Sequence, residues 1–339
     1  MPQSQIPAIA AHGDRSNHKL AYIYAAECCH LYNSGAVTLY DLALTEVVRT
    51  ITVPTPNFIV VDRSGRLYTV NQSYQPSVTE YDQGSEKPSR RIRLGGAWAA
   101  VTDSSNNLYV AVCTACLPYG SGNGSINVYG AGTTKLLRTI TQGVNIPVSV
   151  AVDSVGNLYV ANRSYADSSV TVYAPGSTKI LRTLSRRLTN PTQLALDASN
   201  NLFVMNASLN SYGSVVEYQA NSSEILRHIT NGVLLPQAIA VDDSGNLFVA
   251  NSPEFSSGWI SVYAPGQSRP SYKIKIGVHK PVALTADDEG NLYVADNGPN
   301  RAPRYIGTVC VYAANTQTPM RCVRRERRFD QPSWLAIGP

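Results

Sequence analysis

Residues 147–184 read PVSVAVDSVGNLYVANRSYADSSVTVYAPGSTKILRTL, and this stretch decides the fold because the chain repeats its pattern seven times. It contains four short apolar runs, separated by a Gly-Asn turn, a variable loop and an Ala-Pro-Gly turn. Self-similarity with a period of about 45 residues is typical of a propeller or a solenoid. The second apolar runs of the seven copies end at Tyr24, Asn71, Val112, Asn162, Asn206, Asn251 and Asp296.

The apolar runs alternate with period two, which indicates strands. In Val170–Tyr173 β-branched and aromatic residues favour a strand, and the Ala-Pro-Gly turn that follows cannot continue it. Four strands per repeat and seven repeats predict an all-β, seven-bladed β-propeller, with an N-terminal extension over 1–19 and a single propeller domain over 20–339. A sandwich would need unrelated strands, and a parallel β-helix would need a shorter period.

The two ends of the chain predict how the ring closes. The repeats begin at a second strand, Leu20–Ala25, and finish on a first strand, Pro332–Ile337. We therefore expect the C-terminal strand to complete the first blade and leave no open sheet edge. Residues 6–11 are a rival for that place, but the Pro-x-x-Leu-Ala-Ile spacing of the C-terminal strand matches the other copies better.

Composition supports a folded chain and excludes several classes of protein. Apolar residues make up 43% and charged residues 15% of the 339 positions, which is neither a disordered nor a collagenous bias. The sequence has no run of about 18 apolar residues, so no membrane span is predicted. Residues 1–20 lack an apolar stretch of signal-peptide length. We expect an extracytoplasmic or secreted protein whose signal is not in this chain, and a cytoplasmic location stays open.

Two kinds of repeat unit carry a family resemblance. Residues 236–251 (PQAIAVDDSGNLFVAN) and 281–296 resemble NHL-type repeats, while residues 37–42 (VTLYDL) and 48–53 (VRTITV) are similar to YncE-like, surface-layer propellers. The resemblance covers nearly the whole chain and implies the same seven-bladed fold. It is weak for function, because these families include protein-binding and nucleic-acid-binding modules, sensor domains, lactonases and lyases.

Two sets of repeated polar residues are predicted to be structural. The aspartates of the Asp-x-x-Gly-Asn turns are expected to accept backbone hydrogen bonds; they are Asp62, Asp103, Asp153, Asp197, Asp242 and Asp287. The asparagines that end the second strands are expected to satisfy loop backbone groups; they are Asn71, Asn162, Asn206 and Asn251.

The candidate binding face is the one that carries the variable loops between second and third strands. Nearly every loop has an aromatic residue ahead of its third strand: Tyr32, Tyr74, Tyr119, Tyr165, Tyr212, Phe255 and Tyr305. Arginines gather in the loops and connections of the same face: Arg186, Arg187, Arg301, Arg304, Arg324, Arg325, Arg327 and Arg328. With a net charge of +5, this predicts a face that binds an anionic, carbohydrate or protein partner, with nucleic acid left open. The alternatives are tyrosines that cover their own blades and arginines that are merely solvated.

Cysteine spacing makes one definite prediction. Residues twelve apart pair Thr38 with Thr50 and Thr171 with Thr183 across third and fourth strands, and the same spacing pairs Cys310 with Cys322. We expect a disulfide between Cys310 and Cys322 in an oxidising compartment, with two reduced thiols as the alternative. The roles of Cys28, Cys29, Cys113 and Cys116 stay open between local disulfides and free thiols, and no metal site is predicted from them.

Catalytic motifs are missing from the sequence. There is no paired-histidine metal motif, no Gly-x-Ser-x-Gly elbow and no phosphate-binding glycine loop. The first hypothesis is therefore a binding module without a cofactor. The alternatives are a lactonase- or lyase-like enzyme with a metal at the channel mouth, held by Glu27, Asp167, Glu254 or Asp296, and a non-catalytic surface scaffold.

Overall fold

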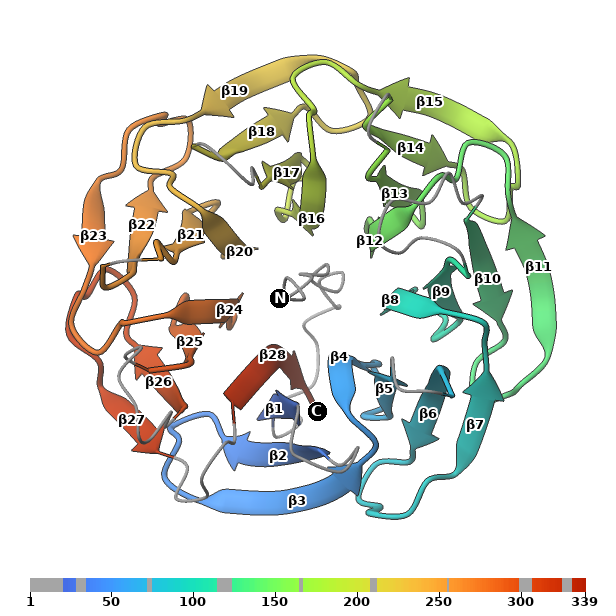
Figure 1. The fold of residues 1–339 in the computed structure, drawn as a ribbon, viewed down its shortest axis with the longest axis horizontal. Helices are drawn as coiled ribbons and strands as arrows, with labels where there is room; N and C mark the ends of the chain where they lie inside the picture. The colour runs from blue at the N-terminus through green and yellow to red at the C-terminus, as the bar shows by residue number, and fades with distance from the viewer. Residues whose placement is uncertain are drawn as a thin grey trace.

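The computed structural model confirms the seven-bladed propeller. It describes residues 21–28, 35–71, 75–114, 124–164, 167–207, 212–254, 256–298, 307–324 and 331–339. Seven four-stranded antiparallel sheets stand in a ring around a central axis (Figure 1). In the described ranges no helix is long and apolar enough to cross a bilayer.

Every blade has four strands, which are named below from the innermost to the outermost. The first four blades are blade 1, β28 (Gln331–Gly338), β1 (Tyr22–Cys28), β2 (Gly35–Asp41) and β3 (Val47–Val53); blade 2, β4 (Pro56–Val61), β5 (Leu67–Asn71), β6 (Ser77–Tyr81) and β7 (Arg90–Arg93); blade 3, β8 (Ala97–Thr102), β9 (Leu108–Val112), β10 (Ser125–Tyr129) and β11 (Leu136–Ile140); and blade 4, β12 (Pro147–Val152), β13 (Leu158–Asn162), β14 (Ser169–Tyr173) and β15 (Ile180–Leu184).

The last three blades follow the same order. They are blade 5, β16 (Pro191–Leu196), β17 (Leu202–Asn206), β18 (Ser214–Tyr218) and β19 (Ile225–Ile229); blade 6, β20 (Pro236–Val241), β21 (Leu247–Asn251), β22 (Trp259–Tyr263) and β23 (Tyr272–Ile274); and blade 7, β24 (Pro281–Ala286), β25 (Leu292–Asp296), β26 (Thr308–Tyr312) and β27 (Arg321–Arg324).

Burial explains why the strands differ in sequence from the inside to the outside of a blade. The second strand β13 is buried at every position, because neighbouring blades cover both faces of its sheet. The outermost strand β15 alternates between exposed and buried positions, because its outer side meets solvent. Apolar runs therefore mark the inner strands, and the Leu-Arg-Thr-Leu pattern marks the outer one.

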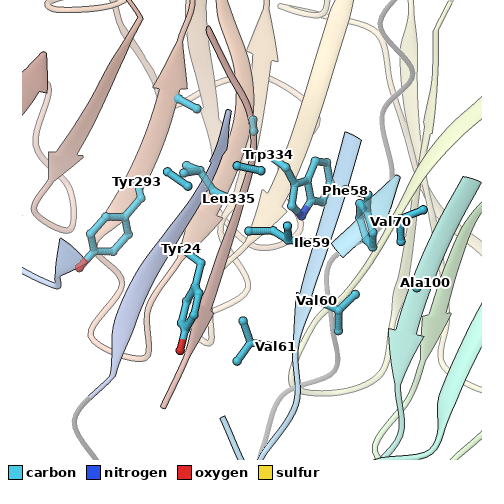
Figure 2. Close-up of a cluster of buried hydrophobic side chains, with 14 of the residues drawn as sticks. Tyr24, Phe58, Ile59, Val60, Val61, Val70, Ala100, Tyr293, Trp334 and Leu335 are labelled. Carbon is cyan, nitrogen blue, oxygen red and sulfur yellow. The ribbon is translucent and has the colours of Figure 1, made fainter. Parts of the chain in front are cut away.

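The C-terminal strand closes the ring, as the sequence predicts. β28 pairs antiparallel with β1, from Tyr22 opposite Gly338 to Cys28 opposite Gln331. The ring of Trp334 on β28 packs on Phe58 of blade 2, with centroids 4.7 Å apart (Figure 2). The rival segment 6–11 and the extension 1–19 lie outside the described residues.

The turn aspartates accept backbone hydrogen bonds, which confirms their predicted structural role. Asp153 Oδ1 accepts from the amides of Val155 at 3.1 Å and Asn157 at 2.8 Å. Its Oδ2 accepts from Asn157 Nδ2 at 2.8 Å and from the Tyr159 hydroxyl at 3.2 Å. Blades 5 and 6 depart from this pattern, because Phe203 and Phe248 stand at the tyrosine position.

The strand-ending asparagines fasten the connections between blades. Asn162 Oδ1 accepts from the amide of Asn145, seventeen residues earlier, at 2.9 Å. Its Nδ2 donates to the carbonyl of Gly143 at 3.1 Å and to the hydroxyl of Thr171 at 3.1 Å. The predicted backbone role is thus confirmed for Asn162, and the equivalent bonds of Asn206 and Asn251 tie the connections into blades 5 and 6 in the same way.

The predicted disulfide is present in blade 7. Cys310 and Cys322 stand opposite each other on β26 and β27, with an S–S distance of 2.05 Å. They occupy the pair position where blade 4 has Thr171 and Thr183. Cys113 is also disulfide-bonded. Cys29, Cys116 and the side chain of Cys28 lie outside the part of the chain that the structure describes, so their roles stay open.

Candidate functional site

The two ends of the ring have different chemistry. The first-to-second-strand and third-to-fourth-strand turns lie at one end, which we call the turn face. The loops between second and third strands and the connections between blades lie at the other end, the variable-loop face. In blade 5 the two parts of the variable-loop face meet, because Asn206 at the end of β17 donates from Nδ2 to the carbonyl of Arg187 at 3.1 Å.

Most of the predicted site residues fall outside the described ranges: Tyr32, Tyr74, Tyr119, Tyr165, Phe255, Tyr305, Arg301, Arg304, Arg325, Arg327 and Arg328. The structure places the remaining four on the variable-loop face. Arg324 is exposed at the end of β27. Tyr212 is 75% exposed in the loop ahead of β18, so this tyrosine does not cover its own blade. Arg186 and Arg187 are exposed in the connection from β15 to β16.

Arg187 has a left-handed backbone conformation. The connection into blade 5 makes a turn in which the amide of Leu188 donates to the carbonyl of Ser185 at 3.2 Å, and Arg187 lies inside it with φ of 65°. Three other connections make the same turn and place a glycine at this position: Gly143 with φ of 71°, Gly232 with φ of 81° and Gly277 with φ of 76°. A turn with positive φ at its third residue favours glycine, because a Cβ atom is strained there.

Blade 5 holds this strained turn in place. The Tyr218 hydroxyl donates to the carbonyl of Arg186, and Asn206 holds the carbonyl of Arg187. A left-handed conformation costs an ordinary residue about 1 kcal/mol, and such strain persists when the surroundings fix it. The turn therefore presents two guanidinium groups to solvent on a fixed backbone.

His228 on β19 joins the two arginines. Its imidazole is exposed, and its pKa is lowered by partial burial and by the positive charge of Arg187. His228 lies one residue before the end of β19, the end at which this strand leads to the variable-loop face, and the charge of Arg187 acts on it. We call Arg186, Arg187 and His228 the blade-5 basic cluster. Positive groups that repel each other in this way are stabilised by a bound anion.

Sequence reasoning did not single out His228 or the conformation of Arg187. The available signal was the alignment of connections: Arg187 stands where the equivalent connections have Gly143, Gly232 and Gly277. His228 likewise stands where blades 3 and 4 have Thr139 and Thr183.

The carboxylates considered for a channel-mouth metal show a different arrangement. Asp296 is fully buried, and its oxygens accept from the amides of His279 and Gly298, each at 2.7 Å. Asp296 thus fastens a connection as the asparagines of other blades do. In the part of the chain that the structure describes, no three His, Cys, Asp or Glu side chains come together as a metal site.

Comparison with known proteins establishes the fold and not the family. No family model matches the chain, and no curated protein matches it. Among solved structures, hydrazine synthase of Kuenenia stuttgartiensis superposes with a TM-score of 0.60 and 16% identity, over 75% of this chain and 76% of that chain. At this identity the likeness supports the propeller fold alone. Because 1057 solved chains match, the fold itself does not select one function.

Proposed function

We propose that the protein is a binding module whose variable-loop face holds an anionic ligand or partner. The blade-5 basic cluster forms the described part of this site. One observation carries the proposal: Arg187 occupies a left-handed position that three equivalent turns fill with glycine. An arginine retained there at a cost in stability is best explained by a task for its guanidinium group.

The chemistry of the cluster suits carboxylate, sulfate or phosphate groups. A guanidinium presents a planar set of donors that matches two oxygens of such a group. The turn is already fixed by Tyr218 and Asn206, so little conformational freedom is lost when an anion binds. The exposed ring of Tyr212 at the same end of blade 5 adds a flat surface for a sugar or an apolar group.

The remaining arginines extend the proposal to a ligand with several charges. Arg301, Arg304, Arg325, Arg327 and Arg328 belong in sequence to loops and connections of this face. The NHL-type or YncE-like kinship, supported by the repeat sequences, is part of the same proposal. The Cys310–Cys322 disulfide supports a site of action outside the cytoplasm, because disulfides persist in oxidising compartments.

A heparin-derived hexasaccharide tests the proposal. We expect it to bind at about 50 mM salt and to weaken steeply as salt is added, because bound anionic groups release counterions. NMR titration of the histidines provides a local readout. The pKa of His228 is lowered by partial burial and by the charge of Arg187, and a bound anion should raise it by offsetting that charge.

A control variant separates the cluster from general electrostatics. Lys179→Ala removes an exposed charge from the turn face and should leave binding within about twofold, since exposed charges far from a site contribute little at moderate salt. Absence of binding at low salt, or binding that leaves the pKa of His228 unchanged, would contradict the proposal.

A further inference from the structure

A pocket of about 510 Å³ opens on the turn face, between blades 5 and 6. These blades lie side by side in the ring (Figure 1). The pocket is at the opposite end of the propeller from the blade-5 basic cluster, so the proposed anion site does not use it. The charged residues that line it, together with Asn201, are Asp197, Glu217 and Arg227 from blade 5 and Asp243 from blade 6.

A buried ion pair forms the floor of the pocket. Glu217 is 6% exposed and Arg227 is 7% exposed, and Arg227 Nε donates to Glu217 Oε2. Arg227 Nη1 donates across to blade 6, to the carbonyl oxygens of Gln267 at 2.5 Å and Ala264 at 3.3 Å.

Blade 2 contains the same pair with a second arginine at ion-pair distance from it. Glu80 and Arg90 occupy the positions of Glu217 and Arg227, with Glu80 Oε1 3.4 Å from Arg90 Nη1. A second guanidinium lies beside them, because Arg66 Nε is 3.7 Å from the same Oε1. Arg66 also approaches Asp82 Oδ1 at 3.4 Å and Asp62 Oδ2 at 3.7 Å.

Blade 5 has a shorter residue where blade 2 has Arg66. The equivalent position is Asn201, the fourth residue after the turn aspartate in both blades. The amide of Asn201 is turned to its own turn, where Nδ2 donates to Asp197 Oδ2 at 2.8 Å. No side chain of blade 5 therefore reaches the place that the Arg66 guanidinium fills in blade 2.

The glycines of the facing turns confirm that this volume is open. A Cβ atom added to Gly132, which faces blade 2, would lie 3.4 Å from Arg66 Cζ and 3.2 Å from Arg90 Nη1. The equivalent glycine facing blade 5 is Gly266, and a Cβ atom added there would meet nothing within 4 Å. The space that the Arg66 guanidinium fills beside blade 2 is thus open beside blade 5, and it forms the pocket.

The charges of the pocket favour a cation. Asp197, Glu217 and Asp243 line it together with a single arginine, Arg227. Asp243 of blade 6 adds a carboxylate next to blade 5. The equivalent residue next to blade 2 is Ser104 of blade 3, which carries no charge. Burial raises the pKa of Glu217, and Arg227 opposes that shift only in part. A second cation would therefore stabilise the Glu217 carboxylate.

We propose that the pocket between blades 5 and 6 binds a guanidinium group, in the position that Arg66 occupies in blade 2. The group comes from an arginine side chain of a partner protein or from a small guanidino compound. A planar guanidinium can contact two or three carboxylates at once, as Arg66 does, whereas an ammonium group acts as a point charge.

Calorimetric titration with Nα-acetyl-arginine amide at low salt tests this proposal. We expect saturable binding of one equivalent at millimolar or lower concentration, and binding of Nα-acetyl-lysine amide that is weaker by about fivefold or more. Free arginine, titrated in parallel, distinguishes the sources. Equal affinity for the amide and the free amino acid favours a protein side chain, and tighter binding of the free amino acid favours a small molecule.

Two matched variants locate the site. Asn201→Arg supplies the guanidinium that blade 2 already has, and should abolish binding while the protein stays folded. Asn291→Arg makes the same substitution at the equivalent position of blade 7, where Asn291 Nδ2 also donates to the turn aspartate, and should bind as the parent does. Asp243→Ser should weaken binding without filling the pocket. No binding by the parent, or unchanged binding by both Asn201→Arg and Asp243→Ser, would overturn the proposal.

Discussion

Single polar residues decide how tightly each connection is fastened to its blade. Asn162, Asn206 and Asn251 each accept a hydrogen bond from an amide seventeen residues earlier. In blade 2 the residue seventeen before Asn71 is Pro54, which has no amide hydrogen to donate. Asn71 Oδ1 is accordingly buried without a hydrogen-bond partner among the described residues.

This difference predicts unequal effects of one substitution at two equivalent positions. Asn162→Ala should lower the free energy of unfolding by about 3 kcal/mol, because it leaves several buried polar groups unsatisfied. Asn71→Ala should lower the free energy of unfolding by about 1 kcal/mol less, because Asn71 Oδ1 accepts no hydrogen bond that the substitution could remove. Urea denaturation of the two variants measures both values, and a larger loss for Asn71→Ala would contradict this description of the fastening.

At the scale of elements, β28 has the largest single role, because it supplies the innermost strand of blade 1. Trp334 and Leu335 on this strand are almost fully buried, and β28 contacts blades 2 and 7 as well as its own blade. The strand therefore joins the last repeat to the first.

Deleting residues 331–339 should open blade 1 and expose the edge of β1. Loss of the buried Trp334 and Leu335 side chains alone should cost at least about 4 kcal/mol, so we expect aggregation or a much lower melting temperature. Thermal unfolding and light scattering check this outcome. A truncated chain that melts with the full-length chain would show that another segment closes the ring.

The elements also show how far sequence reasoning reaches. The sequence predicts four strands per repeat, closure of the ring by residues 332–337 and the Cys310–Cys322 pair. These features could be predicted because the alternation of apolar residues and the fixed spacing of twelve residues can be read directly from the sequence. The backbone strain at Arg187 depends on φ, which shows in sequence only as one exception to a glycine position. The pocket between blades 5 and 6 arises because a long side chain is missing there. No local sequence motif predicts such a pocket, because it depends on residues of two different blades.

At the scale of the whole molecule, the two ends of the ring are proposed to bind opposite charges. The variable-loop face presents the blade-5 basic cluster, while the turn face has a pocket lined by Asp197, Glu217 and Asp243. Both proposed sites include residues of blade 5, but they lie at opposite ends of this rigid blade and share no residue. Variants at one end should therefore leave binding at the other unchanged.

The central claim is that Arg187 is kept for binding at the expense of stability, and Arg187→Gly tests it most directly. Glycine relieves the left-handed strain but is more flexible in the unfolded chain, so the free energy of unfolding should rise by about 0.5 kcal/mol. Hexasaccharide affinity should fall about tenfold, the loss of about 1.4 kcal/mol expected for one charged contact. Arg187→Lys keeps the charge and the strain but loses the planar pair of donors, so it should leave stability unchanged and retain only part of the affinity. Urea denaturation and binding measured on the same samples should show Arg187→Gly more stable and weaker in binding; a variant that binds as the parent does would contradict the account.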